Sequence, residues 1–302
     1  MMPRVARDVV VIGGTGVDTI VRVPELPVPV ADSVMAPGIR DWAGHTGYGV
    51  AMGCHSLGLS TALLDLVGDD PQGELVRAEC ARRGVELHHQ VNPAGTSRSV
   101  NLVDATGRRM SFYDGRSGPD LRLPREFYLP HVAGARHVHV SIMDFARHLF
   151  DDLIDLGVPT STDLHDWDGD NPYHWEFARR ADVVTLSIVK ITDRYREVMG
   201  RILAEGRAQV VIGTAGADGC HVLARGQDVV RHVPAATPAR PVVDSNGAGD
   251  AFVAGFLYGR LAGWPLERCV RAGTVAGAHA CGAEGTHADV IDGPTLLGAL
   301  DN

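Results

Sequence analysis

The chain has 302 residues, 45% of them hydrophobic, and a formal net charge of −9. This size and hydrophobic content can fill one large core or two modest ones. The acidic balance argues against a nucleic acid or an anionic membrane surface as partner, because both attract basic proteins. Lys190 is the single lysine among 28 basic residues, and no GxxxxGK loop contains it, which excludes a P-loop nucleotide site.

The N-terminal stretch MMPRVARD runs directly into the strand-like VVVIGG without an apolar targeting segment, and no apolar run reaches 18 residues. The five cysteines are dispersed and form no CxxC pair, a pattern typical of reduced thiols. We therefore expect a cytoplasmic protein without disulfide bonds.

Short β-branched runs alternate with helix-length segments along the chain. In chain order they fall at 9–12, 49–57, 63–67, 73–83, 138–141, 145–155, 181–186, 209–213, 250–261 and 269–281. Such alternation is typical of parallel βαβ units whose sheet is covered on both faces. The sequence predicts an α/β fold, a doubly wound and mostly parallel sheet flanked by helices, in one domain over residues 1–302.

Two stretches interrupt this alternation. Residues 20–40 contain four prolines among alternating apolar residues, and residues 96–113 are typical of two strands around a turn at 104–107. Both predict a small β-sheet lid, inserted from about 19–45 and 94–116. Residues 164–175, LHDWDGDNPYHW, have the composition of a polar loop.

The strongest motif is VVDSNGAGDAFVAGFLYG at 242–259. The pattern predicts a strand that ends at Asp244, a turn of small residues, and a helix that begins near Asp250. In a strand-turn-helix unit of this kind, the helix N-terminus carries partial positive charge and binds anions.

The backbone N–H groups of Gly247, Ala248 and Gly249 would point into this anion site and stabilise charge on a phosphoryl group. Asp250 would lie within reach of the anion and accept a proton from an attacking hydroxyl. The alternative is structural: an aspartate N-cap followed by small residues that allow tight helix packing.

The segment DSNGAGDAF resembles the D-T-x-G-A-G-D-x-F signature of the ribokinase family, the PfkB-type sugar and nucleoside kinases, and it has some adenosine-kinase-like character. VVVIGGTGVDTIVRV, LLDLVGDDPQGELVRAECARRGVEL, TSRSVNLVDATGRRMSFY and VVIGTAGADGCHVL also resemble family segments, in the family's order. The resemblance implies a ribokinase-like fold and ATP-dependent transfer of the γ-phosphoryl group to a sugar hydroxyl. A nucleoside kinase, and a sugar- or nucleoside-binding regulatory protein with weakened catalysis, are the alternatives.

By this resemblance Asp250 is the general base, and the residues before it, Gly247 to Gly249, form the anion hole. Asp18, Gly44 and Thr46 would bind substrate hydroxyls. The implied nucleotide-binding residues are Lys190, Thr214, Gly216, Gly219 and Thr274.

The resemblance further implies ATP and Mg²⁺ as cofactors and K⁺ as an optional one, the monovalent cation lying near Asp244, Asn246 and Gly285. A homodimer that pairs through the lid is plausible by resemblance only.

The chain also departs from the family pattern. In GHTGYG, His45 replaces the second glycine of the first signature and Gly49 replaces its asparagine, and Ser187 and Lys190 replace both polar members of N-x-x-E. We hypothesise that Lys190 reaches toward the β- or γ-phosphate and supplies positive charge there. The alternative is an exposed lysine at a helix start.

Asp18 follows GGTG and is expected at the carboxyl edge of the first strand, where open α/β sheets bind ligands. A dinucleotide-binding loop is disfavoured, because prolines occupy the place where that fingerprint needs a helix. Histidines occur in pairs, as at His137 and His139, without a converging third ligand, and we expect them to be structural rather than metal-binding.

Overall fold

The computed structural model describes residues 6–118 and 120–301. Residues 1–5, on which the expectation about N-terminal targeting partly depends, lie outside this range. In the described residues, no helix combines the length and apolar character needed to cross a membrane.

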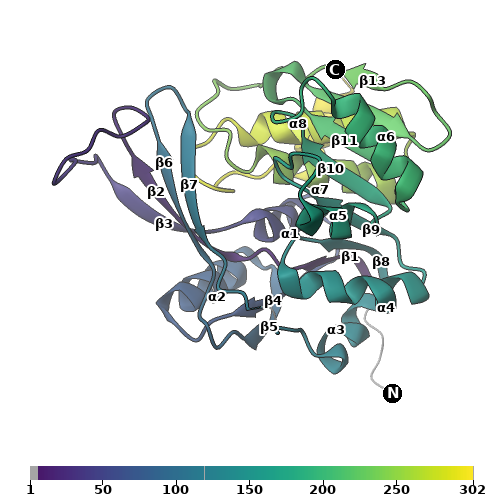
Figure 1. Ribbon diagram of the computed structural model, residues 1–302, viewed down its shortest axis with the longest axis horizontal. Helices are drawn as coiled ribbons and strands as arrows, with labels where there is room; N and C mark the ends of the chain where they lie inside the picture. Colours follow the sequence, from purple (N-terminus) through teal and green to yellow (C-terminus); the bar gives the residue numbers. More distant parts are fainter. Residues whose placement is uncertain (1–5, 119, 302) are drawn as a thin grey trace.

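Two sheets organise the molecule, a large one and a smaller one that projects from it (Figure 1). The large sheet has the strand order β13-β12-β11-β10-β9-β8-β1-β4-β5. Its strands are β1 (Arg7–Ile12), β4 (Thr61–Val67), β5 (Glu86–Val91), β8 (Ala135–Val140), β9 (Thr160–Asp163), β10 (Val183–Ser187), β11 (Val210–Thr214), β12 (Cys220–Ala224) and β13 (Arg231–Val233). Neighbours from β5 to β11 are parallel, and β12 and β13 add an antiparallel edge.

Helices cover both faces of the large sheet, as parallel sheets require. One face packs against α1 (Thr46–Ser56), α2 (Pro71–Arg83), α7 (Ala248–Leu261), α8 (Leu266–Ala280) and α9 (Gly293–Leu300). The other packs against α3 (Arg125–Val132), the 3₁₀ helix η1 (Asp144–Leu149), α4 (Phe150–Asp155), α5 (Pro172–Ala178) and α6 (Tyr195–Glu205). The predicted doubly wound α/β class is confirmed.

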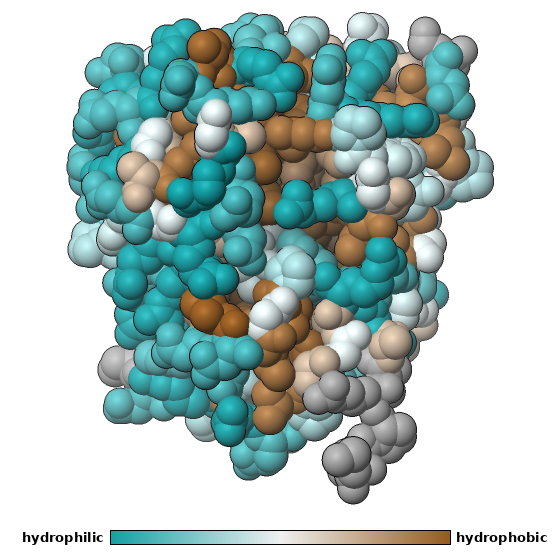
Figure 2. Space-filling view, turned by 90° about the vertical axis from the view of Figure 1, so that its right-hand side faces the viewer, coloured by the Kyte–Doolittle hydropathy of each residue, from teal (hydrophilic) through white to brown (hydrophobic). Residues whose placement is uncertain are grey.

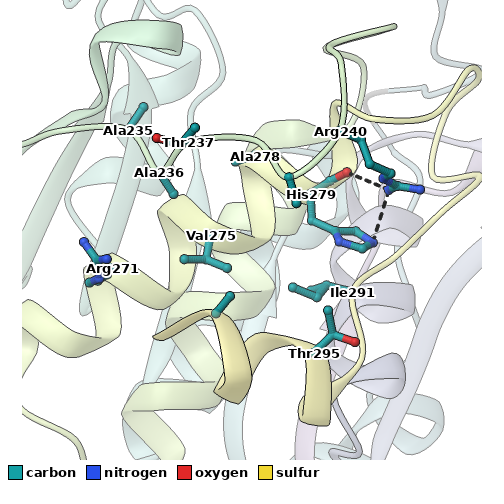
Figure 3. Close-up of a pocket in the computed structure, with 12 residues that line it drawn as sticks. Ala235, Ala236, Thr237, Arg240, Arg271, Val275, Ala278, His279, Ile291 and Thr295 are labelled. Carbon is teal, nitrogen blue, oxygen red and sulfur yellow. Dashed lines mark hydrogen bonds between the residues drawn. The ribbon is translucent and has the colours of Figure 1, made fainter. Parts of the chain in front are cut away.

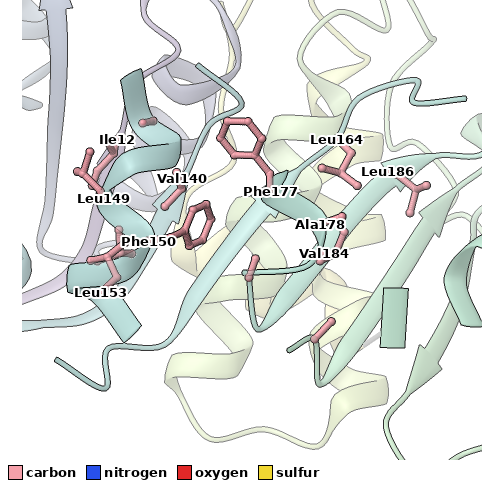
Figure 4. Packing of buried hydrophobic residues seen from close by; sticks show 14 of the residues in the cluster. Ile12, Val140, Leu149, Phe150, Leu153, Leu164, Phe177, Ala178, Val184 and Leu186 are labelled. Atoms are coloured by element: carbon pink, nitrogen blue, oxygen red, sulfur yellow. The ribbon is translucent and has the colours of Figure 1, made fainter. Parts of the chain in front are cut away.

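The strands contribute alternate residues to two apolar cores. Ile12 of β1 and Val140 of β8 face Phe150 and Leu153 of α4, while Phe177 of α5 lies in the same core (Figure 4). In β4 all seven residues are buried, so this strand contributes to both cores. Removal of this apolar area from water is the main force that holds the layers together.

The smaller sheet is the predicted lid. Its order is β3-β2-β6-β7, with β2 (Gly16–Arg22), β3 (Ile39–Gly44), β6 (Arg98–Val103) and β7 (Arg109–Asp114). The strands begin and end within a few residues of the predicted insertions, although the first starts at Gly16, not at about 19. On the side of the molecule opposite the lid, hydrophilic residues surround smaller hydrophobic patches (Figure 2).

The predicted location of Asp18 at the end of the first strand is wrong. The main-sheet strand ends at Ile12, because Gly13 and Gly14 turn the chain with φ of 77° and 78°, and Asp18 then lies inside lid strand β2. The buried carboxylate of Asp65 accepts the N–H of Thr15 at 2.7 Å, which fixes the point where the lid begins.

The predicted strand ending at Asp244 is also absent. Val242 and Val243 are more than half exposed, and residues 241–245 pair with no sheet strand. Helix α7 begins at Ala248, two residues earlier than predicted.

The predicted loop at 164–175 contains the start of α5. Asn171 caps this helix by accepting the N–H of Tyr173 at 3.0 Å, and Pro172 occupies the first helical position, where its missing N–H costs nothing.

Candidate active site

A cavity of about 580 Å³ lies between the lid and the carboxyl edge of the large sheet. Gly14, just after β1, and Ser141, just after β8, line it together with Asp18 and Asp250. Strand order reverses at β1, since β4 and β8 lie on opposite sides of it. Ligands of open α/β sheets bind at this kind of switch point.

The segment before α7 builds one end of this cavity. Gly247 is the N-cap with φ of 76°, and the N–H groups of the first helical turn are oriented as in an anion site. The Ala248 N–H also donates to the Ser245 carbonyl at 3.3 Å. Asp250 stands in this first turn and is 7% exposed. The predicted juxtaposition of a carboxylate with a helix N-terminus is present.

Burial raises the pKa of Asp250 well above its ordinary value, and the carboxylates of Asp163 and Asp18 raise it further. The guanidinium of Arg109, from the lid, acts in the opposite direction. A carboxyl group with a raised pKa is a better proton acceptor once it is ionised, which suits a general base.

Lid residues hold Asp18 at the other side of the cavity. Its Oδ1 accepts a short hydrogen bond from Ser99 Oγ and one of 3.3 Å from Asn101 Nδ2, and its Oδ2 accepts the His45 N–H at 3.3 Å. Burial acts to raise the pKa of Asp18, but the neighbouring His45 and the hydrogen bond from Ser99 hold it below the ordinary value. Asp18 is therefore a buried carboxylate whose two oxygens both accept hydrogen bonds from the protein.

The other two predicted substrate residues adjoin Asp18. A Cβ on Gly44 would overlap Asp18 Oδ2, so only glycine leaves room for this carboxylate. Thr46, the first residue of α1, lines the cavity. Between them, His45 adopts φ of 70° and places its Nε2 3.5 Å from Asp18 Oδ1.

Side chains of the lid reach each residue of the predicted monovalent-cation region. Arg22 lies 3.6 Å from the Asp244 carboxylate, Arg109 donates to the Asn246 amide oxygen, and Trp42 packs against Gly285. A guanidinium thus already lies beside the one carboxylate of this group. The cation assignment stays a prediction.

A second cavity, of about 320 Å³, lies beside the predicted nucleotide loop (Figure 3). Thr214 ends β11, and Gly216 and Gly219 follow with φ of 58° and 92°. A Cβ on Gly219 would overlap the backbone at 233–235, the segment that leads into the cavity. Thr274, on α8, precedes a cavity residue, Val275.

Lys190 lies in the turn after β10, with its Nζ 2.7 Å from Asp166 Oδ2. Both side chains are more than half exposed, and Asp166 lines the larger cavity. The lysine therefore stands at the rim of the site, and its predicted contact with phosphate remains a hypothesis.

Sequence reasoning missed several polar residues of the site, among them Asp163, Asn101, Arg109 and His287. Asp163 is the last residue of β9, so its position at the end of a strand-like run could have indicated a residue of the site. The other three come from the lid or from the segment after α8, and only the tertiary structure brings them to Asp18 and Asp250.

The histidine pair of β8 forms hydrogen bonds inside the large sheet. His137 and His139 are buried, and Nε2 of His137 and Nδ1 of His139 contact Ser161 Oγ at 2.8 and 2.9 Å. Among the residues described, no three His, Cys, Asp or Glu side chains converge as a metal site would require.

Comparison with known proteins agrees with this geometry. The model of the pfkB family carbohydrate kinases matches residues 6–151 and 180–292. The acarbose 7(IV)-phosphotransferase of an Actinoplanes species is 50% identical over 291 residues, 96% of this chain and 97% of that protein. Fructoselysine 6-kinase of Escherichia coli is 29% identical over 79% of this chain and 89% of its own.

Solved structures agree as well. The microbiome-derived acarbose kinase Mak1 superposes with a TM-score of 0.92 at 44% identity and covers 99% of this chain and 100% of its own. Ribokinase of Arabidopsis thaliana, complexed with ribose and ATP, gives a TM-score of 0.82 at 20% identity over 99% of this chain and 100% of its own, which shows the fold alone. Together the relatives and the cavity identify an ATP-dependent sugar kinase. The chain belongs to the pfkB family of carbohydrate kinases.

Proposed function

We propose that this kinase transfers the γ-phosphoryl group of ATP to a hydroxyl of acarbose or of a closely related multi-ring sugar. The observation that carries the proposal is the cavity of about 580 Å³ with Asp18 and Asp250 on its walls and the α7 N-terminus at one end. Its volume lies in the range of about 300–1,000 Å³ that holds drug-sized ligands. The 50% identity to an acarbose phosphotransferase supports the acceptor.

In the proposed mechanism Asp18 orients the sugar by accepting hydrogen bonds from its hydroxyls. Asp250 takes the proton of the attacking hydroxyl as the hydroxyl oxygen bonds to the γ-phosphorus, while the bond from that phosphorus to the β,γ-bridging oxygen breaks and ADP leaves. The N–H groups of Gly247, Ala248 and Gly249 stabilise the transferring phosphoryl group, because they are fixed before the charge develops. The lid excludes water, which would otherwise accept the phosphoryl group.

We place ATP between the two cavities, with its base in the smaller one, lined by Thr237, Val275 and His279 among others, and its phosphates toward α7. The implied nucleotide residues are the predicted set Lys190, Thr214, Gly216, Gly219 and Thr274. This direction brings the γ-phosphoryl group to the anion site beside Asp250.

Asp163 is suited to Mg²⁺ that arrives with ATP, since its Oδ2 lies near Gly249 and Mg²⁺ commonly uses one or two carboxylates besides phosphate oxygens. When bound, Mg²⁺ neutralises phosphate charge. The region of Asp244, Asn246 and Gly285 is the proposed place of a monovalent cation such as K⁺.

We further infer that residues 1–302 form one domain and that the protein acts in the cytoplasm. A homodimer through the lid is supported by exposed apolar residues on its outer strands, namely Ile39 of β3 and Met110 and Phe112 of β7.

The test measures ADP release with acarbose, fructose, fructoselysine and adenosine as acceptors. We expect the highest kcat/KM with acarbose. Turnover of adenosine alone would favour the nucleoside alternative, and a rise in melting temperature with a sugar but no turnover would favour the regulatory one.

Replacement of the base tests the mechanism. We expect Asp250→Asn to lower kcat by about 10²–10⁴-fold, while sugar binding is retained, because an amide cannot accept the proton. Asp155→Asn, at an exposed position on α4, is the matched control and should keep wild-type kcat. Wild-type kcat in Asp250→Asn would refute the mechanism.

A further inference from the structure

His287 lies in the segment after α8 and has an unusual backbone conformation. Its φ of 57° is in the left-handed region, which residues other than glycine rarely adopt. Its side chain is only 3% exposed. Strain of this kind persists where the surroundings hold it in place, and it concentrates at functional sites.

Two glycines make room for the His287 ring. A Cβ on Gly49, in α1, or on Gly247, just before α7, would overlap the imidazole. The ring of Tyr48 lies 5.9 Å away, centroid to centroid. The imidazole is thus enclosed between the N-terminal parts of α1 and α7, and any larger residue at position 49 or 247 would displace it.

One nitrogen of the ring is left without a partner. His287 Nε2 is buried and forms no hydrogen bond with any of the described residues. A neutral imidazole has one donor and one acceptor nitrogen, and the acceptor role is open to Nε2.

This nitrogen lies beside the proposed base. His287 Nε2 is 3.4 Å from Asp250 Oδ2, and among the described residues it forms no hydrogen bond. Both atoms belong to residues that line the 580 Å³ cavity. A buried polar atom without a partner is unfavourable, and a hydroxyl group entering the cavity would relieve this cost.

We propose that His287 Nε2 accepts a hydrogen bond from a sugar hydroxyl next to the one that Asp250 deprotonates. His287 is then a specificity-determining residue, and the kinase selects acceptors with hydroxyls on neighbouring carbons. This inference rests on the role of Asp250 proposed above.

The experiment measures acarbose affinity by calorimetry without nucleotide, in His287→Gln and His287→Asn, each with and without Asp250→Asn. Fructose replaces acarbose if it is the sugar that the kinase turns over. The longer glutamine side chain can place an acceptor near the position of Nε2, whereas asparagine cannot. ADP affinity reports intact folding, and His88→Asn, on edge strand β5, is the matched control.

We expect His287→Asn to bind the sugar about 10-fold more weakly than wild type, in both backgrounds, and His287→Gln to stay within about 3-fold. ADP affinity and His88→Asn should match wild type. Equal sugar affinity of the Asn and Gln variants would overturn the proposal. A loss that disappears in the Asp250→Asn background would also overturn it, because His287 would then act only by positioning Asp250.

The same variants separate this inference from the proposed function. If Asp250→Asn keeps wild-type turnover, the base assignment fails whatever His287 does. If Asp250→Asn is inactive and His287→Asn binds sugar as wild type does, the base assignment stands and the His287 contact alone is wrong.

Discussion

The large sheet and the lid are built on opposite principles. β4, in the large sheet, buries all seven residues, whereas β7, at the lid edge, exposes all six. In β6 the buried positions alternate with partly buried ones, and two of the three, Ser99 and Asn101, are polar and point at Asp18. Apolar burial holds the large sheet in place, while the inner face of the lid presents polar side chains to the cavity.

The largest expected difference is in the free energy of unfolding, when one apolar side chain in each region is shortened to alanine. Leu64→Ala, in β4 at 0% exposure, should lower the free energy of unfolding by about 2–5 kcal/mol, because it leaves a cavity in the core. Met110→Ala, in β7 at 47% exposure, should cost about 0.5 kcal/mol or less. Urea unfolding measures both, and similar losses would contradict the contrast.

The junction between the regions carries a pH-dependent contribution. Burial raises the pKa of Asp65 to about 7, against an ordinary value of 3.8. The folded state keeps this proton while the unfolded state loses it. The contribution of Asp65 to stability is therefore fully present below pH 4 and is lost as the pH rises to 7, by up to about 4 kcal/mol.

Asp65→Asn should remove this fall, because the amide does not titrate. The measurement is the free energy of unfolding at pH 4.5, 5.5 and 7 for both proteins. A parallel pH dependence in wild type and Asp65→Asn would show that the carboxyl does not keep its proton on folding.

Substitutions on the inner face of the lid should weaken sugar binding. Ser99→Ala removes the short hydrogen bond to Asp18, and we expect the sugar KM to rise about 10-fold with the ATP KM unchanged. Ser117→Ala, exposed beyond β7, is the matched control and should leave both values unchanged. A change in ATP KM instead would mean that the lid does not act on the sugar alone.

The smallest effect concerns the rim of the large sheet. Lys190→Met should raise the ATP KM about 3-fold, because it removes a positive charge from the hypothesised phosphate path, and Lys190→Arg should restore it. If Lys190→Met leaves ATP KM, kcat and Mg²⁺ dependence unchanged, Lys190 is only the exposed partner of Asp166.

Much of the large sheet could be predicted, because hydrophobic periodicity is local and strands buried on both faces have a distinct composition. Asp250 and its preceding glycines could be predicted for the same reason: a helix N-terminus is made by consecutive residues. The strand expected before Asp244 was wrong because β-branched residues form a strand only where a neighbour pairs with them, and Val242 and Val243 are exposed.

By itself, the sequence determined the α/β class, the presence of a lid, and the position of Asp250 in the first turn of a helix, since each depends on residues that are close together in the chain. Only the tertiary structure decided that Asp18 belongs to the lid, because two glycine φ values redirect the chain after Ile12. It also decided that His287 fills the space left at Gly49 and Gly247. The contact between His287 and Gly49 joins residues more than 200 positions apart, and no local pattern encodes it.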